Sequence, residues 1–169
     1  MDRSVVTAAA AVLAMATAAS DANAQDRTPV ETQNVETVLR LFEDGWGARD
    51  GWRDIWRGTM APEVRSFFHS QPAVEGIEEA IAFNAGLFDG FPELAVSVED
   101  VMAEGDSVVV RARLTGTQDG PFLGAPPSGQ PVDVPDVTLF TLANGKVVEM
   151  RYFTDLLAVM TAIGAGPRD

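Results

Sequence analysis

Few side chains in this sequence could carry out chemistry, and their types limit what that chemistry is. The chain has no cysteine, which excludes a thiol nucleophile, a cysteine-ligated zinc site and disulfide bonds. Its single histidine is His69, so a metal site with several histidines is excluded, and any Ser-His-Asp arrangement would have to use that one ring. The sequence has no phosphate-binding loop, carboxylate-rich calcium loop or basic stripe, and no metal is expected.

Asp155 is a carboxylate at the end of the last strand-like segment. Four residues precede it at intervals of two, which predicts that the five side chains share one face of a strand. They are Val147, Glu149, Arg151 and Phe153. Asp is also a preferred N-cap, and a helical turn is predicted directly after it. The residues alone leave open whether Asp155 faces a site or caps that helix.

A long loop from Gly116 to Val132 reads GTQDGPFLGAPPSGQPV and interrupts a regular run of strands. Gly and Pro are this dense only where the backbone needs special angles, so the loop is predicted to have a shape of its own. Long shaped loops beside a sheet often rim a binding site.

Strands with period-two patterns are predicted on both sides of this loop. They cover residues 64–69, 94–103, 107–115, 132–142 and 146–155. Asn144-Gly145, between the last two, is the strongest short hairpin signal in a sequence.

Three helices and a C-terminal helical turn are predicted to cover the strands. Thr28-Pro29-Val30-Glu31 is a capping box followed by an apolar stripe at helical spacing. A second helix is predicted between Asp50 and Ala61-Pro62, and a third begins at Gly76 and stops at Gly90-Phe91-Pro92. Helices followed by antiparallel strands imply an α+β fold, with the helices packed on one face of a curved sheet.

Several side chains on these stripes could either line a pocket or form the core. Aromatic residues at helical spacing are most often core, but they also offer surface to an apolar ligand. The candidates are Trp46, Trp52, Trp56, Phe68 and Phe88. Asn84 lies on the apolar stripe of the third helix, and a buried amide must find hydrogen-bond partners because leaving it unsatisfied costs roughly 1–3 kcal/mol. It is a candidate pocket group or a satisfied core amide.

Residues 1–24 are predicted to be a secretory signal peptide. Arg3 precedes an Ala-rich apolar run, and Ala22-Asn23-Ala24 fits the small-x-small cleavage pattern. The alternative is an Ala-rich leader or a misassigned start. The apolar run is shorter than the roughly 20 residues that span a membrane, so no membrane association is expected after cleavage. A polar spacer over residues 25–33 follows, and the protein is expected to be exported, to the periplasm or beyond the cell.

Acidic residues outnumber basic ones, and the formal net charge is −13. Such a surface repels phosphate backbones, so nucleic acid is not an expected partner. The acidic residues are scattered, which is typical of solvated faces.

Three segments together resemble a known family: the loop 116–132, the hairpin FTLANGKVVE and the segment DLLAVMTAIG that starts at Asp155. They are similar to the SnoaL-like polyketide cyclase, or ester cyclase, branch of the nuclear transport factor two-like superfamily, over residues 34–164, with 165–169 as a C-terminal tail. The most specific match is the signature G-T-x-x-G-x-F-x-G-x-P-P-[ST]-G. The resemblance implies a cone-shaped, curved antiparallel (mixed) sheet with the N-terminal helices on its concave face, an apolar pocket, cofactor-free chemistry and a homodimer.

The resemblance also implies roles for single residues. Asp155 stands where family cyclases have the base that abstracts a carbon-bound proton, and desolvation in an apolar cavity would raise its pKa. Gln118 replaces a usual histidine and could orient a substrate or stabilise an oxyanion. Arg151 replaces a frequent tryptophan and could bind an anionic oxygen, or only pair with Asp155. His69 could be a general acid, or an edge histidine with one hydrogen bond.

The leading hypothesis is an acid/base enzyme of the cyclase, isomerase or lyase type that acts without a cofactor on a small apolar carbonyl compound. Its expected catalytic residues are Asp155, Gln118 and His69, and its expected substrate contacts are Arg151, Asn84, Trp46, Trp56, Phe68 and Phe88. The alternative is a non-catalytic periplasmic ligand-binding or dimeric interaction module with the same fold. An epoxide-opening hydrolase is disfavoured, because the Asp-Arg-Asp arrangement that such enzymes use is not evident.

Overall fold

A computed structural model describes residues 26–68 and 71–166 of this chain. In chain order its elements are α2 (Pro29–Asp44), α3 (Trp52–Thr59), β1 (Met60–Phe68), β2 (Val74–Glu75), α4 (Ile77–Gly90), β3 (Ala95–Glu104), β4 (Ser107–Thr117), β5 (Pro131–Ala143), β6 (Lys146–Tyr152) and α5 (Leu156–Ala162). The predicted α+β class is confirmed. The predicted signal peptide and His69 lie outside the described residues.

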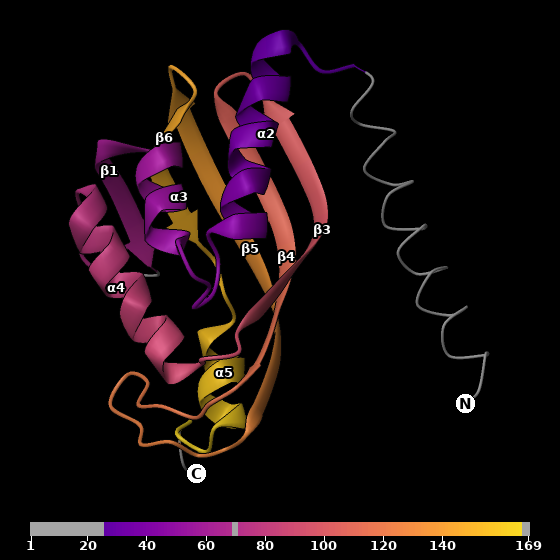
Figure 1. The fold of residues 1–169 in the computed structure, drawn as a ribbon. Coiled ribbons are helices and arrows are strands. Elements are labelled where there is room, and N and C mark those ends of the chain that lie inside the picture. The colour runs from indigo at the N-terminus through magenta and orange to yellow at the C-terminus, as the bar shows by residue number, and fades with distance from the viewer. Residues whose placement is uncertain (1–25, 69–70, 167–169) are drawn as a thin grey trace, which may run out of the picture.

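The strands form one six-stranded sheet in the order β2-β1-β6-β5-β4-β3. All neighbours pair antiparallel except β1 and β6, which are parallel. The sheet is curved, and α2, α3 and α4 lie over one of its faces while α5 lies near one end of the long strands (Figure 1). The mixed, curved sheet with helices on one face agrees with the predicted architecture.

Local sequence signals correctly predicted the start of α2 and the turn between β5 and β6. Thr28 caps α2 as predicted, because its side chain accepts from the backbone N–H of Glu31 while the Glu31 carboxylate accepts from the backbone N–H of Thr28. Between β5 and β6, Asn144 and Gly145 have φ values of 51° and 72°. Two successive positive φ values are those of a tight type I′ hairpin turn, whose twist matches that of the strands.

The segment between the second helix and the first strand differs from the prediction. Gly51, with φ of 80°, and not Asp50, precedes α3. Ala61 and Pro62, predicted to close the helix, already belong to β1, which begins at Met60 because that residue pairs with Val147 of β6. A partner strand that lies far away in sequence thus extends β1 beyond what local pattern indicates.

The predicted shared face of the last strand is wrong, because β6 contains an irregularity. Thr141 pairs with Glu149 while Leu142 pairs with Val147, so one residue of β6 has no partner of its own. An extra residue in one strand reverses the faces of the residues beyond it. Val147 is therefore fully buried, whereas Glu149 and Arg151 are partly exposed.

The core lies between the helices and the covered face of the sheet, and aromatic rings fill its centre. Trp46 stacks on Phe42 at a ring-centroid distance of 5.3 Å and packs against Trp56 at 5.9 Å. The indole N–H of Trp56 donates to the carbonyl of Gly45 at 2.7 Å. Trp46 and Trp56 are 3% and 0% exposed, so both are core residues, as the alternative reading of the sequence allowed.

Candidate functional site

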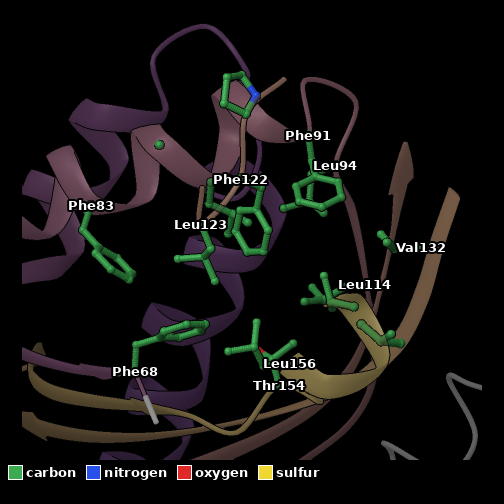
Figure 2. A pocket seen from close by; sticks show the side chains of 15 residues that line it. Phe68, Phe83, Phe91, Leu94, Leu114, Phe122, Leu123, Val132, Thr154 and Leu156 are labelled. Carbon is green, nitrogen blue, oxygen red and sulfur yellow. The ribbon is translucent and has the colours of Figure 1, made fainter. Parts of the chain in front are cut away.

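An apolar cavity of about 290 Å³ lies between α4, the 116–132 loop, α5 and the covered face of the sheet. Its lining consists of Phe68, Phe83, Gly86, Leu87, Phe91, Leu94, Leu114, Pro121, Phe122, Leu123, Val132, Val134, Thr154, Leu156 and Val159. Figure 2 shows that the labelled lining side chains are carbon-rich, with Thr154 beside Leu156. Phe83 and Leu123 are 37% and 56% exposed, so they lie at the mouth.

The predicted loop contributes one wall of this cavity through a tight turn. Phe122 and Ala125 exchange backbone hydrogen bonds of 3.0 and 2.9 Å. Leu123 and Gly124 between them have φ values of 45° and 83°, which is strained for leucine. The turn places the Phe122 ring 5.1 Å from the Phe91 ring, and both line the cavity.

Gln118 holds this loop together and does not line the cavity. Its side chain is fully buried, and its amide nitrogen donates to the carbonyls of Gly120 and Pro126, both at 3.0 Å. Its amide oxygen accepts from the backbone N–H of Ser128 at 3.2 Å. The expected substrate-orienting role is replaced by a structural one, because these bonds occupy both ends of the amide.

Asp155 also lies outside the lining of the cavity. It is exposed, and its carboxylate accepts from the backbone N–H of Ala158 at 2.9 Å, as the N-cap of α5. The structure thus gives Asp155 the capping role that the sequence allowed as the alternative to a base. The neighbouring residues Thr154 and Leu156, on either side of it, are the ones that line the cavity.

Arg151 lies on the opposite face of the sheet from the cavity. It stands between Met150 and Tyr152, which are buried on the helix-covered side, and side chains alternate along a strand. Its guanidinium donates to Glu149 at 2.8 Å and lies 3.9 Å from the centroid of the Phe67 ring. Arg151 therefore forms a surface ion pair with Glu149. It takes neither of its two expected roles, binding an anion and pairing with Asp155.

Asn84 is a satisfied core amide. It is 2% exposed, its nitrogen donates to the carbonyl of Ala80 at 3.0 Å, and it forms a hydrogen bond with the Tyr152 hydroxyl. Burial raises the pKa of Tyr152 far above its ordinary value, the bond from Asn84 opposes this shift, and the negative charge of Asp136 adds to it. Asn84 therefore supports a buried polar cluster instead of facing the cavity.

Only one of the predicted aromatic contacts lines the cavity. Phe68 does, with its ring 5.6 Å from that of Phe83. Phe88 packs edge-on against Trp52 at 4.9 Å, and both border a second, more polar hollow of about 230 Å³ on the other side of α4.

Sequence reasoning missed the polar groups closest to the cavity. Of the described residues in the lining, Thr154 alone has a polar side chain, and its hydroxyl donates to Asp136 Oδ1 at 2.5 Å. Thr138 donates to Asp136 Oδ2 at 2.9 Å. Asp136 and Thr138 are 2% and 0% exposed. A buried carboxyl group therefore stands directly behind the Thr154 hydroxyl.

A signal for this group is present in the pattern of β5. Val132, Val134 and Phe140 alternate on the buried face of the strand, and the two positions between Val134 and Phe140 on that face are Asp136 and Thr138. An acid on an otherwise apolar strand face is uncommon, because burying it requires partners. Asp136 is the acidic exception in this apolar alternation, and the sequence alone could have identified it on that basis.

Within the described ranges, the chain has neither a metal-binding group of side chains nor a membrane-spanning helix. No group of three or more histidine, cysteine or acidic side chains in residues 26–68 and 71–166 could hold a metal ion. In the same part of the chain, no helix combines the length and apolar character needed to cross a membrane.

Solved structures of similar proteins share this fold. A proposed SnoaL-like polyketide cyclase from Jannaschia sp. CCS1 is 77% identical, with a TM-score of 0.81 over 84% of this chain and 99% of that one. AclR from Streptomyces galilaeus, a proposed hydroxylase, is 25% identical, with a TM-score of 0.69 over 81% of this chain and 99% of that one. A protein with a ketosteroid isomerase-like fold from Catenulispora acidiphila DSM 44928 is 18% identical, with a TM-score of 0.65 over 83% and 96% of the two chains, and shows the fold alone.

The family is shown by the sequence itself. No curated protein matches this chain. A family model described as SnoaL-like polyketide cyclase matches residues 36–163, which include the loop signature, the second hairpin and most of the described fold. The chain therefore belongs to the SnoaL-like polyketide cyclase family.

Proposed function

We propose that this protein binds a small, mainly apolar carbonyl compound in the cavity beside Thr154 and promotes proton transfer on it without a cofactor, in a cyclase, isomerase or lyase reaction. The observation that carries the proposal is the combination of an apolar lining with one hydroxyl that is hydrogen-bonded to a buried carboxyl group. An apolar, water-poor site strengthens the electrostatic interactions on which proton transfer depends.

The carboxyl group proposed to receive the proton is that of Asp136, in place of Asp155. A carbon-bound proton of the ligand would move to Thr154 Oγ1 while the hydrogen of that hydroxyl moves to Asp136 Oδ1. The electron pair of the broken C–H bond stays on the ligand as an enolate, and the reverse step returns a proton to carbon. Asp155 is separated from this route, since its carboxylate is exposed and bound to the backbone of α5.

Deuterium exchange tests this proposal without knowledge of the natural substrate. In D₂O, the wild type is expected to accelerate exchange of the activated C–H of 2-tetralone, a small apolar ketone, measured by proton NMR against buffer. Asp136→Asn removes the proton acceptor and is expected to lower the enzymatic rate by about 10²-fold or more, whereas Asp155→Asn keeps a helix cap and is expected to keep the rate. Exchange that survives in Asp136→Asn and is lost in Asp155→Asn would restore Asp155 as the base.

The alternative function is ligand binding without turnover. It is favoured by one observation: Gln118 and Asp155, two of the three residues expected to do chemistry, are both used to hold backbone. Tight binding of apolar probes with no acceleration of exchange would select this alternative.

Export to the periplasm or beyond the cell and a homodimer are also proposed, on the leader composition and on the family resemblance respectively. Neither bears on the cavity, since a dimer through the sheet would use the face that carries Arg151 and Phe67, opposite the helices.

A further inference from the structure

The direction of the hydrogen bonds around Asp136 decides what kind of polar group the cavity can bind. A carboxylate can only accept, and both oxygens of Asp136 receive hydroxyl groups, from Thr154 at 2.5 Å and from Thr138 at 2.9 Å. The Thr154 hydrogen therefore points out of the cavity wall, toward Asp136.

With its hydrogen used in this way, the Thr154 hydroxyl can offer only its lone pairs to a molecule in the cavity. Among the described residues, no other side chain of the lining is polar. A carbonyl or ether oxygen placed beside Thr154 would lose its hydrogen bonds to water and find no donor from a lining side chain, which is unfavourable. A hydroxyl group placed there would donate to Thr154 and be satisfied.

We propose that Thr154, oriented by Asp136, selects ligands whose polar group is a hydrogen-bond donor, such as an enol, phenol or alcohol hydroxyl on an otherwise apolar body. This inference rests on the proposed function only in taking the cavity as the binding site. For a carbonyl compound it means that the C–H group that gives up its proton, and not the carbonyl oxygen, lies against Thr154. Asp136 is a positioning residue in this role, because it acts through Thr154.

A pair of fluorescent probes of similar shape tests the inference. The naphthalene ring is small and apolar, 2-naphthol adds a donor, and 2-methoxynaphthalene replaces that donor by an acceptor. The measured quantity is the dissociation constant of 2-methoxynaphthalene divided by that of 2-naphthol, from fluorescence titration. In the wild type this ratio is expected to exceed its value in Thr154→Val by about 2-fold to 12-fold, the effect of one hydrogen bond.

Two further variants separate the effect of the Thr154 hydroxyl on this ratio from other effects of a substitution. Thr154→Ser keeps the hydroxyl and is expected to keep the wild-type ratio. Thr141→Val makes the same chemical change on β5 at a position outside the cavity lining, and is also expected to keep it. Each variant is first checked by circular dichroism and thermal unfolding. If Thr154→Val fails to fold, a wild-type ratio below one still overturns the inference, and Thr154→Ala replaces Thr154→Val as the variant without the hydroxyl.

The outcomes distinguish this inference from the proposed function. Equal ratios in the wild type and in Thr154→Val, with both probes bound, would overturn the selection by Thr154 and leave the cavity as a binding site. A wild-type ratio below one would overturn it as well, because the cavity would then prefer an acceptor. Failure of both probes and of naphthalene to bind would overturn the proposed function together with the inference.

Discussion

At the scale of single residues, the proposed chemistry depends on a buried polar cluster behind the apolar lining of the cavity. Asp136, Thr138 and Thr154 form one hydrogen-bonded group, and Tyr152 and Asn84 form the next. Buried polar groups need such partners, because each unsatisfied one costs roughly 1–3 kcal/mol. The charge of Asp136 raises the pKa of Tyr152, so the titration of Tyr152 reports on the surroundings of both groups.

Tyr152 offers a direct measurement on this cluster, because it is the only tyrosine in the chain. Burial, with the charge of Asp136, raises its pKa, so the folded protein keeps this proton at pH values where the unfolded chain loses it. In an absorbance titration at 295 nm, no tyrosinate signal is expected near pH 10 until the protein unfolds, whereas the chain in guanidinium chloride is expected to titrate near pH 10.

The same shift has a consequence for stability, with a definite sign. Because the folded state binds one more proton than the unfolded state above pH 10, the free energy of unfolding falls as pH rises, by up to about 1.4 kcal/mol per pH unit. Tyr152→Phe removes this contribution, so the difference in slope between wild type and variant isolates it. Identical slopes above pH 10, or a tyrosinate signal from the folded protein, would contradict the burial of this hydroxyl.

At the scale of elements, the 116–132 loop is built as a rigid wall for the cavity. Gln118 ties three backbone groups of the loop together, and the backbone N–H groups of Asp119 and Gly120 both donate to the carbonyl of Gly90 at the end of α4. The loop and the helix therefore approach each other closely, and both line the cavity through Phe122 and Leu87.

Gly120 is the residue that permits this approach, and its replacement is expected to destabilise the fold. A Cβ atom at this position would lie 2.0 Å from the carbonyl oxygen of Asp89, which is backbone and cannot move aside. Gly120→Ala is therefore expected to lower the free energy of unfolding by about 1–3 kcal/mol or more in urea denaturation, as overpacking does.

Gly58→Ala is the matched control for this prediction. Gly58 lies in α3, and a Cβ atom there would meet nothing within 4 Å. This variant is expected to be neutral, or to gain up to about 1 kcal/mol from the better helix propensity of alanine. Equal stabilities of the two variants would show that the loop can shift away from α4.

At the scale of the whole molecule, the acidic composition limits the expected partners, and the N-terminal segment is the basis of the proposed export. The net charge of −13 keeps the chain soluble and opposes association with phosphate backbones and acidic surfaces. Cleavage after Ala24 would leave the whole of the family match, residues 36–163, in the mature protein. Residues 1–24 would then direct export, and the folded domain would be formed by the rest of the chain.

The proposed export predicts a defined N-terminus. When the full sequence is expressed in a Gram-negative host, mass spectrometry of the periplasmic fraction is expected to find a chain that starts at Gln25. Ala22→Asp combined with Ala24→Asp is expected to block cleavage, since the processing site takes small residues. Recovery of the uncleaved wild type from the cytoplasm alone would remove the export proposal.

The sequence by itself determined most of the helices and strands and the family, because these depend on signals between neighbouring residues. The Thr28 capping box, the Asn144-Gly145 turn and the period-two strands act locally, and the loop signature identified the family. Only the tertiary structure decided which polar groups reach the cavity. Asp155 caps α5 and Gln118 holds the loop, while the pairing of β5 with β6 places Thr154 beside Asp136, 18 residues away in the sequence. That pairing depends on the strand register and on the extra residue in β6, and neither can be read from the pattern of one strand alone.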